Sequence, residues 1–284
     1  MQAEFNEKLP KINLGGTMVG NGATNWSYDT WPSFAQTLAG FNIIEQGLLD
    51  EWEKHECAVY FRNVRPAKMG PECQALAKRG MGFSSDLNWY DLYRKNYDLP
   101  TQTNADRQGS TVIDGKTRYY KKGMTMAEYT PFAGHILESP SAHVVNGDFL
   151  TDYMNREDVR KAFNIPSSVQ TWEQCSSTLR YHPQDEASQW IYQVLRNQTR
   201  LMFYSGDTDG AITTFGTKRW IKELAWPITE AWRPWLTDGQ VSGYTEQYDG
   251  LRFTTIKGVG HMAPQWNRKA VTNMIMAHVH HEDF

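Results

Sequence analysis

The stretch TRLMFYSGDTDG, residues 199 to 210, constrains the fold more than any other part of the chain. Its apolar run, Leu201 to Tyr204, is uninterrupted, which is typical of a β-strand buried on both faces. Such strands belong to parallel sheets that helices cover, and this run ends at once in Ser-Gly-Asp, a turn signal. We therefore predict an α/β protein in which this run is an internal strand.

Other segments fit the same architecture. INLGGTMVGNG, residues 12 to 22, predicts a strand that ends in a Gly-Asn-Gly turn, and LRFTTI, residues 251 to 256, predicts a last strand fed by a hairpin. FLTDYMNREDVRKAFNI, residues 149 to 165, predicts a helix with Asp152 or Asn155 as N-cap. Three further helices are expected at ASQWIYQVLRNQ, GTKRWIKELAW and NRKAVTNMIMAHVH.

The texture of the chain changes between residues 24 and 150. This part is rich in Trp, Tyr and Pro, contains the helix-like FAQTLAGFNIIEQGLLDEWEKH, and continues into a polar, turn-forming stretch, DLPTQTNADRQGSTVIDGKTR. The aromatic piece DLNWYDLYRKNY is interpreted as a helix that packs within this part. We predict a cap or insertion over residues 24 to 150, and a core made of residues 1 to 23 and 151 to 284.

Charge and hydropathy limit the classes of partner. The net charge is −3 with no long basic or acidic run, so we expect no nucleic-acid partner. No segment reaches the roughly 20 apolar residues of a spanning helix, and the charged start MQAEFNEKLPK is not a signal peptide, so we expect no membrane partner. Small molecules or peptides fit better. Two sequons, at Asn25 and Asn197, permit glycosylation.

The cysteines and histidines give no metal pattern. Three cysteines occur without any CxxC pair; if Cys57 closes a short loop with Cys73, Cys175 has no partner in this chain. A cluster of histidines near the end of the chain is interpreted as solvated rather than metal-binding: His278, His280 and His281.

Two strand ends carry groups that could act together in catalysis. Asp209 follows the run at 201 to 204, and His261 lies in IKGVGHMAPQ after the last strand. The carboxyl ends of strands in an open α/β sheet are where reactive groups gather, and the order Asp before His is that of an α/β-hydrolase triad. The imidazole would take a proton from a nucleophile while the carboxylate fixes its tautomer. Either residue alone has a simpler explanation, a turn-stabilising aspartate or a core histidine.

These segments resemble the serine carboxypeptidases of the peptidase S10 family. The resemblance rests on INLGGTMVGNG, YMNREDVRKAFNI, LMFYSGDTDG, WRPWLTDGQVSGYTEQYDGL and GVGHMAPQ, which occur in the family's order. It implies an α/β-hydrolase fold with a mostly parallel sheet and a helical cap, and release of single residues from the carboxyl ends of peptides or proteins. It also implies a lysosomal, vacuolar or extracellular location, and no cofactor.

Carried onto this sequence, the resemblance implies that Asp209 is the catalytic acid and His261 the base. Met262 would help to line the site near the end of the substrate, and Asp207 would hold the turn. No Gly-x-Ser-x-Gly pattern occurs, and the family's Gly-Glu-Ser-Tyr and Trp-Asn-Gly-Gly-Pro-Gly segments are missing. In the family, a cysteine near the position of Cys175 pairs with one from that missing region. We therefore expect an incomplete domain without its front strands, and no meaningful peptidase activity from this chain alone.

Three interpretations stay open at this point. In the first, the sequence is part of a longer serine carboxypeptidase, or the chain combines with a separate chain that supplies the serine. Alternatively, it is a truncated, non-catalytic member that serves as a binding or structural subunit. A third interpretation is another α/β hydrolase, such as an esterase, which would share the Asp and His but does not account for WRPWLTDGQVSGY.

Overall fold

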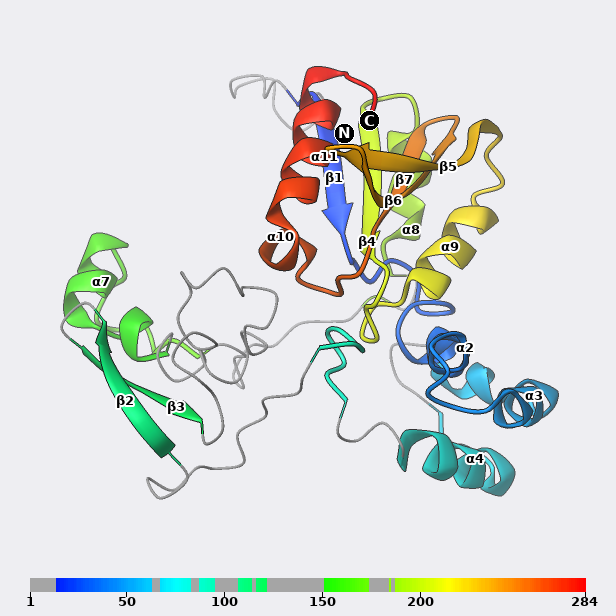
Figure 1. The fold of residues 1–284 in the computed structure, drawn as a ribbon, viewed down its shortest axis with the longest axis horizontal. Coiled ribbons are helices and arrows are strands. Elements are labelled where there is room, and N and C mark those ends of the chain that lie inside the picture. Colours follow the sequence, from blue (N-terminus) through cyan, green and yellow to red (C-terminus); the bar gives the residue numbers. More distant parts are fainter. Residues whose placement is uncertain are drawn as a thin grey trace.

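The computed structural model describes residues 14–62, 67–82, 87–94, 107–113, 116–121, 151–173, 184 and 187–284. The sequence also predicts the tail of a helix at residues 1 to 10, and this segment, like Cys175, lies outside these ranges. Figure 1 shows the elements, which in chain order are β1 (Gly16–Gly20), η1 (Trp31–Ser33), α2 (Phe34–Gly40), α3 (Gln46–Lys54), η2 (Cys57–Phe61), α4 (Pro71–Gly82), β2 (Arg107–Ile113), β3 (Lys116–Lys121), α7 (Glu157–Ala162), α8 (Gln189–Leu195), β4 (Arg200–Gly206), α9 (Thr214–Glu223), β5 (Ile228–Thr237), β6 (Gln240–Tyr248), β7 (Leu251–Ile256), α10 (Ala263–Trp266) and α11 (Arg268–His280).

The main sheet has five strands in the order β1-β4-β7-β6-β5. β1, β4 and β7 run parallel, whereas β6 is antiparallel to both β7 and β5. The sheet is therefore mixed, and the expectation of a mostly parallel sheet is corrected. The reason is local: β5 and β6 are joined by the two-residue turn Asp238-Gly239, in which both residues have positive φ, and such a turn forces antiparallel pairing.

Helices cover both faces of the sheet, α10 and α11 on one side and α8 and α9 on the other (Figure 1). Alternation along β4 explains the layers, because successive side chains of a strand point to opposite faces. Leu201 and Phe203 belong to the cluster that includes Trp220 of α9, whereas Met202 belongs to the cluster that includes Met274 of α11. The prediction of a strand buried on both faces is thus confirmed for β4, in which all three residues are less than 5% exposed.

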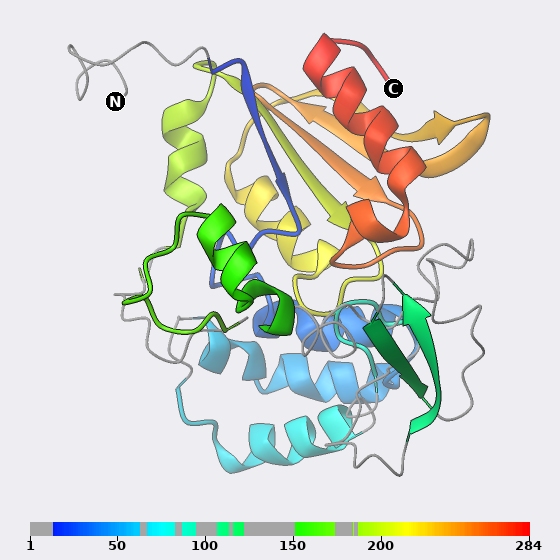
Figure 2. The ribbon, with the colours of Figure 1, turned by 90° about the vertical axis from the view of Figure 1, so that its left-hand side faces the viewer.

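A second, smaller core lies among α2, α3 and α4, below the end of the sheet where β1 and β4 finish (Figure 2). The predicted helical run from residue 34 to 55 is two helices, α2 and α3, separated at Asn42, which has positive φ. The stretch expected to be turn-forming contains instead the antiparallel hairpin β2–β3, which forms its own two-stranded sheet.

The helix expected from residue 149 is interrupted. A helical turn ends at residue 154, and α7 begins only at Glu157, with Arg156 as the N-cap residue and no side-chain cap. Neither Asp152 nor Asn155 caps it. The Asn155 side chain instead accepts from the Trp172 backbone N–H at 2.7 Å and donates to the Trp172 carbonyl at 2.9 Å, so a nonlocal partner has displaced the local capping role.

A disulfide joins Cys57 and Cys73, which are 16 residues apart, within the smaller core. Closing a loop of this size stabilises a protein by about 3 kcal/mol in the chain-entropy estimate. We expect Cys57→Ala/Cys73→Ala to lower the free energy of urea unfolding by about that amount while leaving the main sheet folded. Loss of all secondary structure by circular dichroism would contradict this local role.

Within the described ranges, no helix has the length and apolar character that crossing a bilayer requires.

Candidate active site

Asp209 and His261 meet at one end of the sheet. β4 and β7 are parallel neighbours, so the loops that follow Gly206 and Ile256 emerge side by side. Asp209 lies in the first loop and His261 in the second, and His261 Nδ1 is 2.8 Å from Asp209 Oδ2. The two side chains that the sequence singled out are therefore hydrogen-bonded, 52 positions apart in the chain.

The Asp209 carboxylate is 1% exposed and fully engaged. Oδ2 also accepts from Asn21 Nδ2 at 2.7 Å, and Oδ1 accepts from the backbone N–H groups of Ala211 at 2.7 Å and Ile212 at 3.0 Å. Burial raises the pKa of Asp209, and the hydrogen bonds from His261 and from the two backbone groups oppose that rise. The carboxylate is thus held in one orientation by donors on both of its oxygens.

Asn21 is a site residue that the sequence predicts only as part of the Gly-Asn-Gly turn after β1. It follows β1, adopts φ 45°, and directs its side chain to the end of the neighbouring strand β4. Its Nδ2 donates to Asp209, and its Oδ1 accepts from the Gly206 N–H at 3.2 Å. Three adjacent parallel strands therefore contribute to the site. The tolerance of asparagine for positive φ was the signal available in the sequence.

The His261 side chain is 31% exposed, in contrast to its buried partner. An ionised carboxylate only accepts hydrogen bonds, so the Nδ1 position facing Asp209 carries the proton and Nε2 is left as an acceptor. The ring packs edge-on against Tyr90, with centroids 5.3 Å apart, and the His261 backbone N–H donates to the Tyr90 carbonyl at 2.7 Å. The imidazole is therefore oriented as a base that can take a proton through Nε2.

Asp207 and Met262 lie close to the pair in sequence, and they have different contacts. Asp207 Oδ1 accepts from the Gly258 N–H at 2.7 Å, so this side chain ties the Asp209 loop to the His261 loop. Burial raises the pKa of Asp207 to about 6. Met262 is half-buried, begins helix α10 as its N-cap residue, and packs against the cluster under α10 and α11.

Gly260 is the closest approach in the site. A Cβ at this position would lie 1.9 Å from the Tyr90 carbonyl oxygen and 2.8 Å from Asp91 Cα, both backbone atoms. We expect Gly260→Ala to destabilise the chain by about 2 to 3 kcal/mol, because the His261 loop must move away from the backbone of Tyr90 and Asp91. Gly47→Ala is the control, since nothing lies within 4 Å of that position. Equal urea midpoints for Gly260→Ala and wild type would contradict the close packing.

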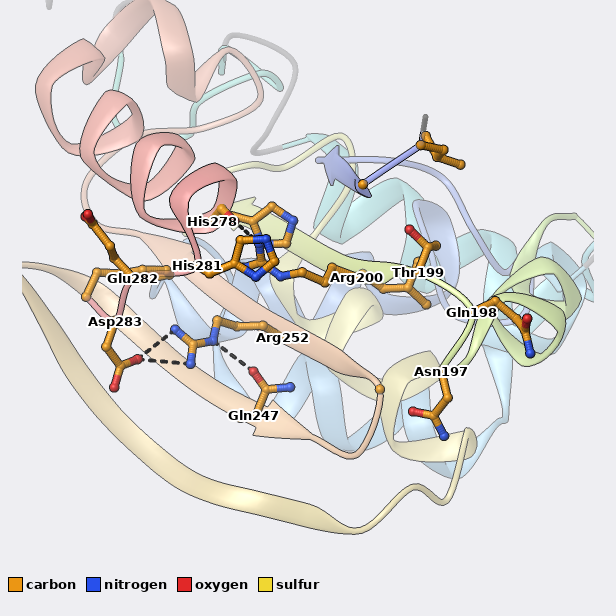
Figure 3. A pocket seen from close by; sticks show the side chains of 15 residues that line it. Asn197, Gln198, Thr199, Arg200, Gln247, Arg252, His278, His281, Glu282 and Asp283 are labelled. Atoms are coloured by element: carbon orange, nitrogen blue, oxygen red, sulfur yellow. Dashed lines mark hydrogen bonds and ion pairs between the residues drawn. The ribbon is translucent and has the colours of Figure 1, made fainter. Parts of the chain in front are cut away.

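Two cavities lie at different distances from the Asp209–His261 pair. One of about 340 Å³ adjoins the Asp209 turn, lined by Trp31, Phe34, Trp89 and Gly210 to Ile212 together with Thr30. A larger one of about 870 Å³ lies at the opposite end of the sheet, where β4 and β7 begin (Figure 3). There Arg252 is paired with Asp283 at 3.1 Å, and the buried His278 has its pKa lowered to about 4 by burial. The site therefore adjoins the smaller cavity.

The other residues singled out in the sequence lie away from the pair. The Asn25 side chain is half-buried and donates to Gln189 Oε1, whereas Asn197 is exposed. His278 is 8% exposed, so it is not solvated as expected, while His280 and His281 are exposed. Among the described residues, no group of three His, Cys, Asp or Glu side chains is placed to hold a metal ion.

The aromatic piece expected to be a helix also reaches the site. Residues 87 to 94 form turns rather than a helix, and they lie between the loops that carry Asp209 and His261. Sequence patterning missed this role because the contacts are backbone hydrogen bonds to residues more than 100 positions away.

Comparisons with known proteins give the class of protein. The fold is similar to that of Kex1Δp, a prohormone-processing carboxypeptidase from Saccharomyces cerevisiae, with a TM-score of 0.60 at 14% identity over 96% of this chain and 56% of that one. The model of the serine carboxypeptidase family, Peptidase S10, matches residues 1–281. The chain belongs to the serine carboxypeptidase family.

Individual relatives agree with this assignment. The chain is 27% identical to serine carboxypeptidase-like 21 of Arabidopsis thaliana, over 92% of this chain and 56% of that protein. It is also 27% identical to serine carboxypeptidase 1 of Hordeum vulgare, over 90% of this chain and 54% of that protein. The chain thus spans about half the length of the curated relatives it matches.

Proposed function

We propose that this chain carries the acid and the base of a serine-type carboxypeptidase, and that a region outside these 284 residues supplies the serine. The observation that carries the proposal is the hydrogen bond from His261 Nδ1 to the buried Asp209 carboxylate, in a chain of the serine carboxypeptidase family. The absence of any Gly-x-Ser-x-Gly pattern from the sequence supports the second half of the proposal.

The geometry suits a triad mechanism. His261 Nε2 would take the proton of the serine as its oxygen attacks the last peptide carbonyl, and would then give that proton to the departing amine. Asp209 would hold the imidazole in the Nδ1–H tautomer and stabilise the imidazolium that forms. The shortened peptide would then be an ester of the serine. Water, giving a proton to His261 Nε2, would attack this ester, and the proton would return to the serine oxygen as the peptide leaves. No cofactor enters this scheme.

We further propose that the five-stranded sheet with its helices is part of an α/β-hydrolase core, formed by residues 1 to 23 and 151 to 284, and that residues 24 to 150 are the cap. The separate helical core around Leu38 and Leu48 supports the second unit. The apolar cavity beside Ala211 and Ile212, together with Met262, would face the substrate.

The disulfide supports a lysosomal, vacuolar or extracellular location, because disulfides persist in oxidising compartments. Glycosylation at the exposed Asn197 would fit the same setting. The substrates would be the carboxyl ends of peptides or proteins, with neither nucleic acid nor membrane as partner.

A non-catalytic, truncated subunit is the second candidate function. The lack of a Gly-x-Ser-x-Gly pattern in these residues fits this candidate, whereas the intact Asp209–His261 pair favours the enzyme. Membership of the serine carboxypeptidase family argues against the third alternative, another α/β hydrolase such as an esterase.

A fluorophosphonate probe, which labels activated serines, distinguishes the proposed enzyme from the non-catalytic subunit. We expect no serine label on the recombinant 284-residue chain, because removing a nucleophile costs on the order of a millionfold in turnover. Protein captured from its natural source with an antibody against this chain should be labelled, and should release the last residue of N-blocked dipeptides. Label on a serine within the 284 residues would contradict the proposal. No label and no release from the native protein would establish the non-catalytic alternative.

A further inference from the structure

A short segment outside the main sheet, residues 88 to 92, touches both loops of the proposed acid–base pair. Its backbone makes three hydrogen bonds across the site. The Leu92 N–H donates to the Thr208 carbonyl at 2.9 Å, the Gly210 N–H donates to the Trp89 carbonyl at 2.9 Å, and the His261 N–H donates to the Tyr90 carbonyl at 2.7 Å. The segment therefore bridges the Asp209 loop and the His261 loop.

Asp91 is at the centre of this bridge and is 1% exposed. Its Oδ1 accepts from the Thr208 hydroxyl at 2.7 Å, and its Oδ2 accepts from the Gly260 N–H at 3.2 Å. Thr208 immediately precedes Asp209, and Gly260 immediately precedes His261. One buried carboxylate thus binds the residue before the acid and the residue before the base.

The Asp91 charge is compensated, which allows it to be buried. Arg94 Nε donates to Oδ2 at 2.9 Å, and the Tyr93 N–H donates to Oδ1 at 3.1 Å. The Arg94 guanidinium also lies over the Trp266 ring, 4.3 Å from its centroid, so the ion pair is anchored to helix α10. A buried charge that is paired and fully hydrogen-bonded is held in a fixed position.

We propose that Asp91 is a positioning residue for the Asp209–His261 pair: its carboxylate fixes the separation of the two loops, and so the hydrogen bond between Nδ1 and Oδ2. This inference rests on the proposed function, because the fixed separation serves catalysis only if the pair acts as acid and base. The structural reason is that β4 and β7 end at Gly206 and Ile256. Beyond them the Thr208 N–H donates to the Val259 carbonyl at 3.2 Å and the Gly258 N–H to Asp207 Oδ1 at 2.7 Å, and Asp91 adds the side-chain link from Thr208 to Gly260, the residue next to His261.

The test follows the His261 Nδ1–H proton by NMR in the 284-residue chain, without any need for turnover. The downfield proton line is assigned by its loss in His261→Gln, and long-range proton–nitrogen spectra report the tautomer of the ring. Asp91→Ala removes all of the hydrogen bonds to the carboxylate, Asp91→Asn keeps one accepting oxygen, and Thr208→Val removes a single bond. Thr245→Val is the control, because its buried hydroxyl bonds to Phe253 and Thr254 within the sheet.

We expect solvent exchange of the Nδ1 proton to accelerate by about tenfold or more in Asp91→Ala and by severalfold in Thr208→Val, with Asp91→Asn between wild type and Asp91→Ala. Thr245→Val should lose stability yet keep its exchange rate within about twofold of wild type. If Asp91→Ala does not fold, Thr208→Val and Asp91→Asn decide the question. Wild-type exchange and tautomer in the folded Asp91 and Thr208 variants, or equal acceleration in Thr245→Val, would overturn the inference. Neither result depends on the serine labelling that tests the proposed function.

Discussion

Under the proposed function, replacing Asp209 by asparagine should lower kcat of the serine-containing enzyme by about ten-thousandfold while leaving KM nearly unchanged. The amide oxygen of the variant can still accept from the Ala211 and Ile212 backbone groups, so the turn should stay folded. Its NH₂ group would then face His261 Nδ1 and favour the wrong tautomer, in which Nε2 carries the proton and cannot act as a base. The measurement is steady-state release of the carboxyl-terminal residue from an N-blocked dipeptide by tagged variants expressed in the natural source.

Asp249→Asn is the matched control, because Asp249 is ion-paired with Arg196 at 2.6 Å in the β6–β7 turn, away from the site. We expect its kcat to equal that of wild type. A kcat for Asp209→Asn within tenfold of the control would show that Asp209 does not orient the base.

The second large effect is on stability. Asp29 is 0% exposed, and its Oδ2 accepts from the backbone N–H groups of Thr24 at 2.6 Å and Asn25 at 2.8 Å. Burial raises its pKa from 3.8 to about 7, against the opposing effect of these two bonds. The folded state therefore binds the proton more tightly than the unfolded state. This contribution to stability is complete below pH 3.8 and is lost as the pH rises to about 7.

The loss amounts to on the order of 4 kcal/mol from this one group, since each pKa unit corresponds to about 1.4 kcal/mol. Urea unfolding of wild type between pH 4.5 and 7.5 should show a falling free energy of unfolding. Asp29→Asn, which stays uncharged, should show a much flatter profile. Asp207, with its raised pKa of about 6, adds a smaller decline of the same sign in both proteins. His278, with its pKa lowered to about 4, adds a rise of opposite sign in both proteins, so the difference between the two profiles reports Asp29.

Asp158→Asn is the control, because Asp158 is exposed and its ion pair with Arg156 lowers its pKa. This variant should keep the wild-type decline. Parallel profiles for wild type and Asp29→Asn would show that the Asp29 carboxyl is not desolvated. The expected higher stability at acidic pH agrees with the proposed lysosomal or vacuolar location.

Local patterns in the sequence were sufficient for several elements. Three examples are the apolar run of β4, the glycine turn after β1 and the helix α11. Each follows from the kinds of residues that are adjacent in the sequence. The order of Asp209 and His261 at two strand ends predicted the candidate site, and the structure places them in a hydrogen bond.

The sequence did not predict the mixed sheet or the β2–β3 hairpin, although both have turn signals. Asp238-Gly239 and Asp114-Gly115 are dipeptides typical of hairpins, but the second lies in a polar stretch without an apolar face. The strand with which a given strand pairs can be far away in the sequence. A turn signal without hydrophobic alternation is therefore not enough to predict the pairing.

By itself, then, the sequence determined that the run in β4 is a strand buried on both faces, that Asp209 and His261 follow two strands in that order, and that no Gly-x-Ser-x-Gly pattern lies within these residues. Only the tertiary structure decided what holds the Asp209 and His261 side chains together. Asn21 and Asp91 lie 188 and 117 residues before the partners they bind in the Asp209 loop, and Asp91 lies 169 residues before Gly260. Hydrogen bonds over such separations exist only once the sheet and loops have packed, because no local pattern encodes where a polar side chain will find its buried partner.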